Sequence, residues 1–144
     1  MDNVICSDKN FIAGLSEEFK ADLHQHPVLE IYAACDGSSH VKIGDEIVSG
    51  QIITIGPDAV HAIADDGKRG LAVFIDPLSE MGYSMKEELL RGDAYGVSYC
   101  DDLTDLLYSL LQNETHDDVY SVSKQLVFKL RGKMIDRPFD DPVL

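Results

Sequence analysis

The feature that most constrains this chain is a change in hydrophobic period close to residue 76. Before it, short apolar runs alternate with glycine, proline, aspartate and serine, which is typical of short strands joined by turns. After it, apolar residues recur every three or four positions, as they do on amphipathic helices. Strands followed by helices indicate an α+β fold, here mainly β. Many short antiparallel strands favour a closed or two-sheet arrangement with few free edges.

The predicted strands follow one another at regular spacing. Gly44 and Asp45 separate two of them, and a two-residue loop headed by glycine favours a type II′ hairpin turn. Residues 56–58 and 65–67 contain the turn formers that end other strands. The predicted strands cover residues 28–34, 41–43, 46–48, 51–55, 60–63 and 70–75.

Helices are predicted for the second half of the chain. The first opens at Pro77 and ends at Arg91, before Gly92. The second carries leucines at positions that share one helical face, and Asp101 and Asp102 can cap its N-terminus. These leucines are Leu103, Leu106, Leu107, Leu110 and Leu111.

The last predicted helix runs from about residue 117 to 134 and forms a hairpin with the helix before it. Residues 101–118 contain six acidic side chains and no lysine or arginine, whereas residues 119–137 contain five lysines or arginines and one acid. The two helices are therefore electrostatically complementary, within one molecule or between two.

The size and composition of the chain fit one globular domain. Its 144 residues are 44% hydrophobic and 26% charged, which allows a core to form without disulfides or a metal. We expect a single domain over residues 1–144, with a barrel over 1–76 and a helical extension over 77–144. No segment approaches the roughly 20 apolar residues of a transmembrane helix, and none has the pattern of a signal peptide. We therefore expect a cytoplasmic protein that makes no membrane contact.

The charge and the cysteines argue against two classes of protein. A net charge of −14 repels the phosphates of nucleic acid, so this chain alone is not expected to bind DNA or RNA. Cys6, Cys35 and Cys100 are widely spaced and form no CxxC pair, so neither a disulfide framework nor a zinc ribbon is indicated. We expect three buried free thiols.

Three histidines and a glutamate are the residues most suited to chemistry. His24, His26 and Glu30 share parity, so on an extended strand they project from one face, and His61 lies on another predicted strand. Three imidazoles and a carboxylate can hold one divalent metal ion such as zinc, nickel, manganese or iron, with room left for water or a ligand. The same four residues could also bind an effector or each other without a metal.

Several neighbours of this group have a weaker assignment. Tyr32 continues the parity of Glu30 and is expected to line the pocket and contact its ligand. Val28 and Ile63 fit either the pocket or the core, and core packing is favoured for both.

Four polar residues are expected to lie on the surface. Lys20 and Asp22 lie near the mouth of the expected pocket, where exposure is the simpler assumption. His40 in a loop and His116 at a helix start lie outside the pattern and are expected to be solvated rather than metal ligands.

The spacing of the four residues resembles the two sequence motifs of the cupin superfamily. Residues 24–30, read as HxHxxxE and followed by Gly37, resemble the first motif, and residues 50–61 resemble the second. The resemblance implies a cupin double-stranded β-helix, a jelly-roll barrel whose interior holds His24, His26, Glu30 and His61 as metal ligands. This chain departs from the usual motif residues at Glu18, Gly56, Asp58 and Asp65.

Within that superfamily, the chain resembles the N-terminal effector-binding and dimerisation domain of AraC-type transcriptional regulators. The resemblance comes from residues 30–37, 60–63 and 74–79 and from the helical hairpin behind them. It implies a small effector, such as a sugar or another small polar molecule, held in the barrel, and a homodimer formed through the C-terminal helices. Residues 137–144 resemble the segment just before the family's DNA-binding module, which is absent from these 144 residues.

The sequence leaves two functions open. The first is a ligand-sensing regulatory domain in which no residue is catalytic. The alternative is a standalone metal-dependent cupin enzyme, such as a dioxygenase, isomerase or lyase. An enzyme needs a general acid or base besides its metal ligands, and Tyr32 and Asp22 are the nearest candidates. The helical second half favours the sensor, because a minimal cupin enzyme does not require it.

Overall fold

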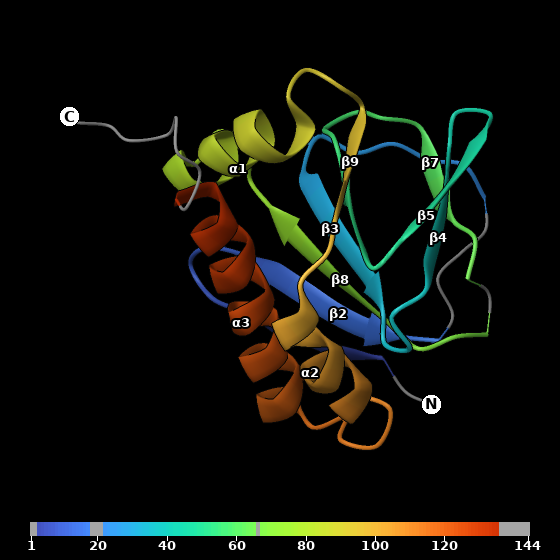
Figure 1. Cartoon of the computed structure of the whole chain (residues 1–144), viewed down its shortest axis with the longest axis vertical. Helices are drawn as coiled ribbons and strands as arrows, with labels where there is room; N and C mark the ends of the chain where they lie inside the picture. Colours follow the sequence, from blue (N-terminus) through green and yellow to red (C-terminus); the bar gives the residue numbers. More distant parts are fainter. Residues whose placement is uncertain (1–2, 18–21, 66, 136–144) are drawn as a thin grey trace.

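The chain folds into two antiparallel sheets that face each other, with helices on the outer side of the larger sheet (Figure 1). The computed structural model describes residues 3–17, 22–65 and 67–135, and the side chains of the last helix through residue 132. The prediction of a mainly β, α+β fold with a cupin-type barrel followed by C-terminal helices is confirmed. Among the described residues, no helix has the length and apolar character needed to cross a membrane.

The larger sheet has the strand order β1-β2-β8-β3-β6-β9. Alternate residues of its central strands face different cores. Ile31 and Val73 pack toward the helices, whereas Tyr32 and Ala72 pack toward the smaller sheet. Burial on both faces explains why β3 and β8 are almost continuously apolar. The bounds are β1 Val4–Ser7, β2 Ile12–Ser16, β3 Leu29–Ala34, β6 Ile52–Ile55, β8 Gly70–Ile75 and β9 Tyr95–Ser98.

The smaller sheet has the strand order β5-β4-β7 and closes over the inner face of the larger one. It consists of β4 (Ser39–Ile43), β5 (Glu46–Gly50) and β7 (His61–Ile63). Strands β4 and β5 form the predicted hairpin, with Ile43 opposite Glu46. Gly44 has a φ of 59° and Asp45 does not have a positive φ, which is the conformation of the predicted type II′ turn.

The helices cover the outer face of the larger sheet. They are α1 (Glu80–Leu90), a short 3₁₀ helix (Asp101–Leu103), α2 (Thr104–Ser109) and α3 (His116–Ile135). Lys129 on α3 lies 3.2 Å from Asp102, so the predicted charge complementarity is realised in one ion pair within the chain. Cys6, Cys35 and Cys100 are buried and unbridged, as predicted.

The structure corrects the prediction that the chain is entirely helical after residue 76. Strand β9 follows α1 and returns to pair with β6, placing Val97 opposite Ile53. Strands β1 and β2 are also absent from the strands predicted above. Each of these three strands contains glycine or serine among its four or five residues, and both residue types favour turns, so no clear hydrophobic period results.

Gly82 lies inside α1 at a position with no room for a side chain. A Cβ atom there would overlap the carbonyl oxygen of Asp76. We expect Gly82→Ala to lower the free energy of unfolding by about 2 kcal/mol, because the backbone must shift. Gly132→Ala in α3 is the matched control, since a Cβ there meets nothing within 4 Å and should stabilise the helix by up to about 1 kcal/mol. Urea denaturation measures both, and a stabilising Gly82→Ala would contradict this packing.

Candidate metal centre

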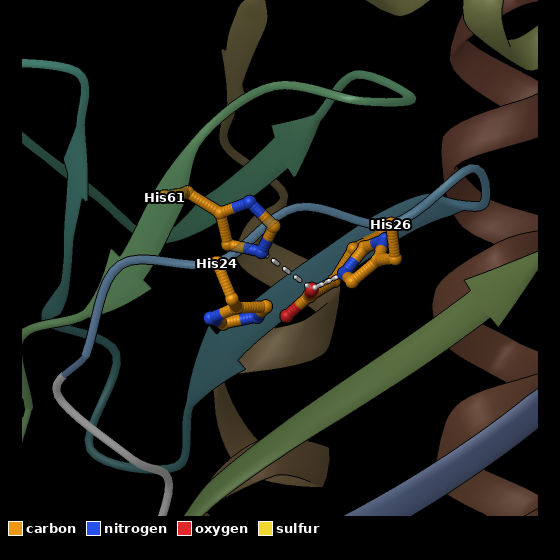
Figure 2. A group of neighbouring side chains, drawn as sticks. His24, His26 and His61 are labelled. Atoms are coloured by element: carbon orange, nitrogen blue, oxygen red, sulfur yellow. Dashed lines mark hydrogen bonds and ion pairs between the residues drawn. The ribbon is translucent and has the colours of Figure 1, made fainter.

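The four predicted residues converge between the two sheets. One ligand atom from each of His24, His26, Glu30 and His61 lies within 4.8 Å of the others. Figure 2 shows the three imidazoles turned toward one another. Glu30 is on β3 of the larger sheet and His61 is on β7 of the smaller one, so the site joins the two halves of the barrel.

The structure corrects how His24 and His26 reach this site. They do not share a regular strand with Glu30, because β3 begins only at Leu29. His24 instead forms an isolated antiparallel bridge to His61, with backbone hydrogen bonds of 2.9 Å in both directions. Pro27 lies between the bridge and β3, and proline has no N–H with which to continue a ladder. The chain therefore crosses from the smaller sheet to the larger between His24 and Glu30.

A backbone carbonyl holds the Nδ1 atom of each imidazole. The distances are 3.1 Å from His24 to the carbonyl of residue 22, 3.2 Å from His26 to that of residue 28, and 2.7 Å from His61 to that of residue 59. A carbonyl oxygen only accepts hydrogen bonds, so each Nδ1 carries a proton. In a neutral imidazole this leaves the Nε2 lone pair for a metal, which is how backbone groups orient histidine ligands in metal sites.

Glu30 Oε1 contacts two of these Nε2 atoms, at 2.9 Å from His26 and 3.0 Å from His61. A carboxylate also only accepts, so both imidazoles face an acceptor through each ring nitrogen. Without a cation, each of the two contacts needs a proton between its nitrogen and the carboxylate oxygen, although His61 is fully buried and Glu30 nearly so. Two ligands at about 2.1 Å from one ion and at right angles are about 3.0 Å apart. The donor set and these two spacings therefore fit a divalent metal.

The charge state of Glu30 agrees with a ligand role. Burial alone would raise the pKa of its carboxyl, but hydrogen bonds from His26 and His61 outweigh this and lower the pKa below the usual value. The hydrogen bond to Glu30 in turn raises the pKa of His26, against the opposing effect of burial. Glu30 is therefore a carboxylate at neutral pH and contributes one negative charge to the centre.

The centre is open on one side. His24 is exposed and the side chain of His26 is 21% exposed, whereas Glu30 and His61 are buried. Phe74 on β8 packs edge-on against His26, with ring centroids 5.7 Å apart. Sequence reasoning did not identify Phe74. Its place next to Val73 in the predicted strand 70–75 indicated only that the two side chains project to opposite faces of the sheet. A small molecule would reach an ion here from the side of His24.

Tyr32 lies on the same face of β3 as Glu30, deeper in the barrel. It is fully buried among aliphatic side chains, and its hydroxyl donates to Asp65 at 3.3 Å. Burial, with Asp65 beside it, raises the pKa of this hydroxyl. Ile63 is buried in the same inter-sheet core, as favoured by the sequence, and Val28 is half-buried. Contact between Tyr32 and a ligand stays a prediction.

The remaining polar predictions have mixed outcomes. Asp22 and His116 are exposed, as predicted, and Lys20 lies outside the described residues. His40 is on β4 rather than in a loop, and its Nδ1 lies 2.8 Å from Asp65 Oδ1. The loop placement was therefore wrong, whereas the side chain is 37% exposed and lies outside the four-residue group. Buried Asp65, which also accepts from the backbone N–H of His40, holds the ring.

Comparisons with known proteins give a likeness of fold. No protein-family model matches the chain, and no curated protein matches it. Similar solved structures include a cupin protein from Bacteroides fragilis, with 18% identity, a TM-score of 0.41, and coverage of 49% of this chain and 70% of that one. A putative ethanolamine utilization protein Q from Salmonella typhimurium has 15% identity, a TM-score of 0.43 and coverage of 51% and 68%. An RmlC-like cupin from Shewanella frigidimarina has 14% identity, a TM-score of 0.41 and coverage of 54% and 78%.

Proposed function

We propose that this chain is a metal-dependent sensor module, in which His24, His26, Glu30 and His61 hold one divalent ion that binds a small molecule at its open positions. The observation that supports the metal is that His26 and His61 each face an acceptor through both ring nitrogens. Lone pairs from three imidazoles and one carboxylate suit zinc, nickel, manganese or iron.

The sensor role proposed here is that of the N-terminal domain of an AraC-type regulator, and strand β8 supports it. Phe74 near the end of β8 contacts His26, and the chain continues from β8 into α1. At the other end, the Arg69 guanidinium donates to the carbonyls of Leu110 and Leu111 beyond α2. Strand β8 therefore contacts the site through Phe74 and leads into α1, and Arg69, the residue before the strand, contacts the turn after α2.

In this proposal, a ligand at the site changes how the helices are held. Such coupling requires the ligand to bind two arrangements of the chain with different affinity. The helices would pass the change to a second copy of the chain, so the expected homodimer through the C-terminal helices is part of the proposal. Phe128 on α3 is 71% exposed and is the candidate centre of that interface.

Catalysis is the second use of such a centre, because a bound divalent ion can polarise an oxygen ligand or lower the pKa of bound water. The two acid–base candidates from the sequence are poorly placed for it. The Tyr32 hydroxyl is buried, donates to Asp65 and has a raised pKa, whereas Asp22 is exposed and contacts His24 through its backbone carbonyl. This geometry favours binding over catalysis.

Metal uptake tests the proposal. Protein stripped with a chelator and titrated with Zn²⁺, Ni²⁺, Mn²⁺ or Fe²⁺ should bind one equivalent of at least one ion, measured by elemental analysis after gel filtration. Saturation at 100 times the dissociation constant should add about 2.7 kcal/mol to the free energy of unfolding. His116→Ala, which removes an exposed histidine outside the site, should bind as the wild type does. Failure to bind any of these ions stoichiometrically would contradict the proposal.

A further inference from the structure

We infer that the ligand of this centre is an amphipathic monoanion, a small carboxylate with an apolar body, rather than a sugar. The inference rests on the proposed function and names the class of ligand that the site takes. It comes from an apolar face of the larger sheet that begins at the metal centre and continues to the edge strand β1. We define this apolar face by Ile5, Ile12, Gly14 and Phe74.

The register of the sheet places this face beside the centre. Ile12 on β2 lies opposite Phe74 on β8, and Phe74 lies opposite Glu30 on β3. Directly opposed residues of antiparallel strands project from the same face, so all three side chains share the inner face of the sheet. The ring of Phe74 also contacts the ring of His26. The apolar face is therefore continuous with the metal ligands.

The neighbouring set of opposed residues on β1, β2 and β8 extends the apolar face. Ile5 on β1 lies opposite Gly14 on β2, and Gly14 lies opposite Ala72 on β8. A Cβ atom built on Gly14 would come no closer to its neighbours than 4.0 Å, to the carbonyl oxygen of Val4. The inner face therefore has room for a ligand at Gly14, whereas Ala72 beyond it is buried in the inter-sheet core.

The inner face is covered over part of its width only. Over β3 and β6 the inner face is buried under the smaller sheet, as Ile53 and Ile55 show. At Ile5 and Ile12 the same face is exposed: Ile5 is 65% and Ile12 is 54% exposed. Large apolar side chains grouped in the open beside a polar centre indicate a binding surface.

The side chains of the apolar face favour a ligand whose uncharged part is apolar. The side chains of Ile5, Ile12 and Phe74 offer no hydrogen-bonding group, and Ser7, opposite Ile12 at the outer end of the row, offers one hydroxyl. Most hydroxyls of a sugar placed against this face would therefore lose water without replacement. An alkyl chain would instead gain about fourfold in affinity for each fully buried methylene.

The charge of the centre favours a carboxylate at the other end of the ligand. A divalent ion, one carboxylate and three neutral imidazoles carry a net single positive charge, which one carboxylate neutralises.

Visible absorption of the Co²⁺-loaded protein gives the test. Titration with acetate, butyrate, hexanoate and gluconate should show that affinity rises at least about tenfold from acetate to hexanoate and that gluconate binds no more tightly than acetate. Ile12→Ser should reduce the hexanoate affinity toward that of acetate, while the Co²⁺ content and the acetate affinity stay unchanged. Ile47→Ser is the matched control, because Ile47 is 58% exposed but lies on β5 of the other sheet.

The outcomes separate the inference from the proposed function. Protein that takes up neither Co²⁺ nor any of Zn²⁺, Ni²⁺, Mn²⁺ and Fe²⁺ in elemental analysis refutes the proposed metal centre. A normal Co²⁺ spectrum with equal affinities for acetate and hexanoate, or with tighter binding of gluconate, overturns the ligand class alone. If Ile12→Ser converts a dimer to a monomer in sedimentation and leaves hexanoate binding unchanged, a second copy covers the apolar face and the inference is wrong.

Discussion

Glu30→Gln is expected to lower the affinity of the chain for a divalent metal at least about 100-fold, since weakening even an outer partner of a metal ligand commonly costs 10- to 100-fold. Glu30 is the one carboxylate of the four-residue group. The substitution keeps the size of the side chain but removes its charge, which leaves three neutral imidazoles around the ion. Competition with a metal-sensitive dye measures the change, and circular dichroism checks that the fold is retained.

Glu46→Gln provides the control for overall charge. Glu46 is exposed on β5, so its loss changes the net charge of the chain by the same amount without touching the centre. Its metal affinity should equal that of the wild type. If Glu30→Gln also bound metal as tightly as the wild type, the four residues would be a hydrogen-bonded polar cluster, which is the alternative that the sequence left open.

The composition of this centre could be predicted from the sequence, but the backbone that forms it could not. Parity and spacing identified His24, His26 and Glu30, and a turn before His61 placed that residue on another strand. The bridge between His24 and His61 joins residues far apart in the chain, and no local pattern specifies such a pair. The break at Pro27 could have been predicted, because proline is a poor member of an interior strand.

The same limit applies to the fold. Strand β9 has no clear period of its own, and it becomes a strand because Val97 pairs with Ile53. His40 reads as a loop residue, yet it lies on β4 and is held by Asp65, which is 25 residues away. Long hydrophobic repeats such as that of α3 were predicted well, because a helix makes its hydrogen bonds within four residues. Pairings between distant residues account for what the sequence did not reveal.

Arg69→Met is expected to lower the free energy of unfolding by about 2 kcal/mol, because it removes the charged donor of two backbone carbonyls, whereas its ion pairs with two half-exposed carboxylates contribute little. The Arg69 side chain is only 13% exposed and lies 3.2 Å from Glu17 and 3.1 Å from Glu114. It also donates to the carbonyls of Leu110 and Leu111, which the helix itself leaves without partners. Methionine fills similar space but supplies no donor, so the two carbonyls and Glu17 lose their hydrogen bonds and Glu114 loses its ion pair.

Urea denaturation of Arg69→Met measures this connection between barrel and helices. Arg131→Met is the control, because Arg131 is exposed on α3 and its loss changes the charge equally; it should shift stability by less than about 0.5 kcal/mol. Equal midpoints for the two variants would mean that apolar packing alone holds the helices. In that case the connection through β8 could not carry a signal from the metal centre, and the sensor role would lose its structural support, whereas metal uptake would be unaffected.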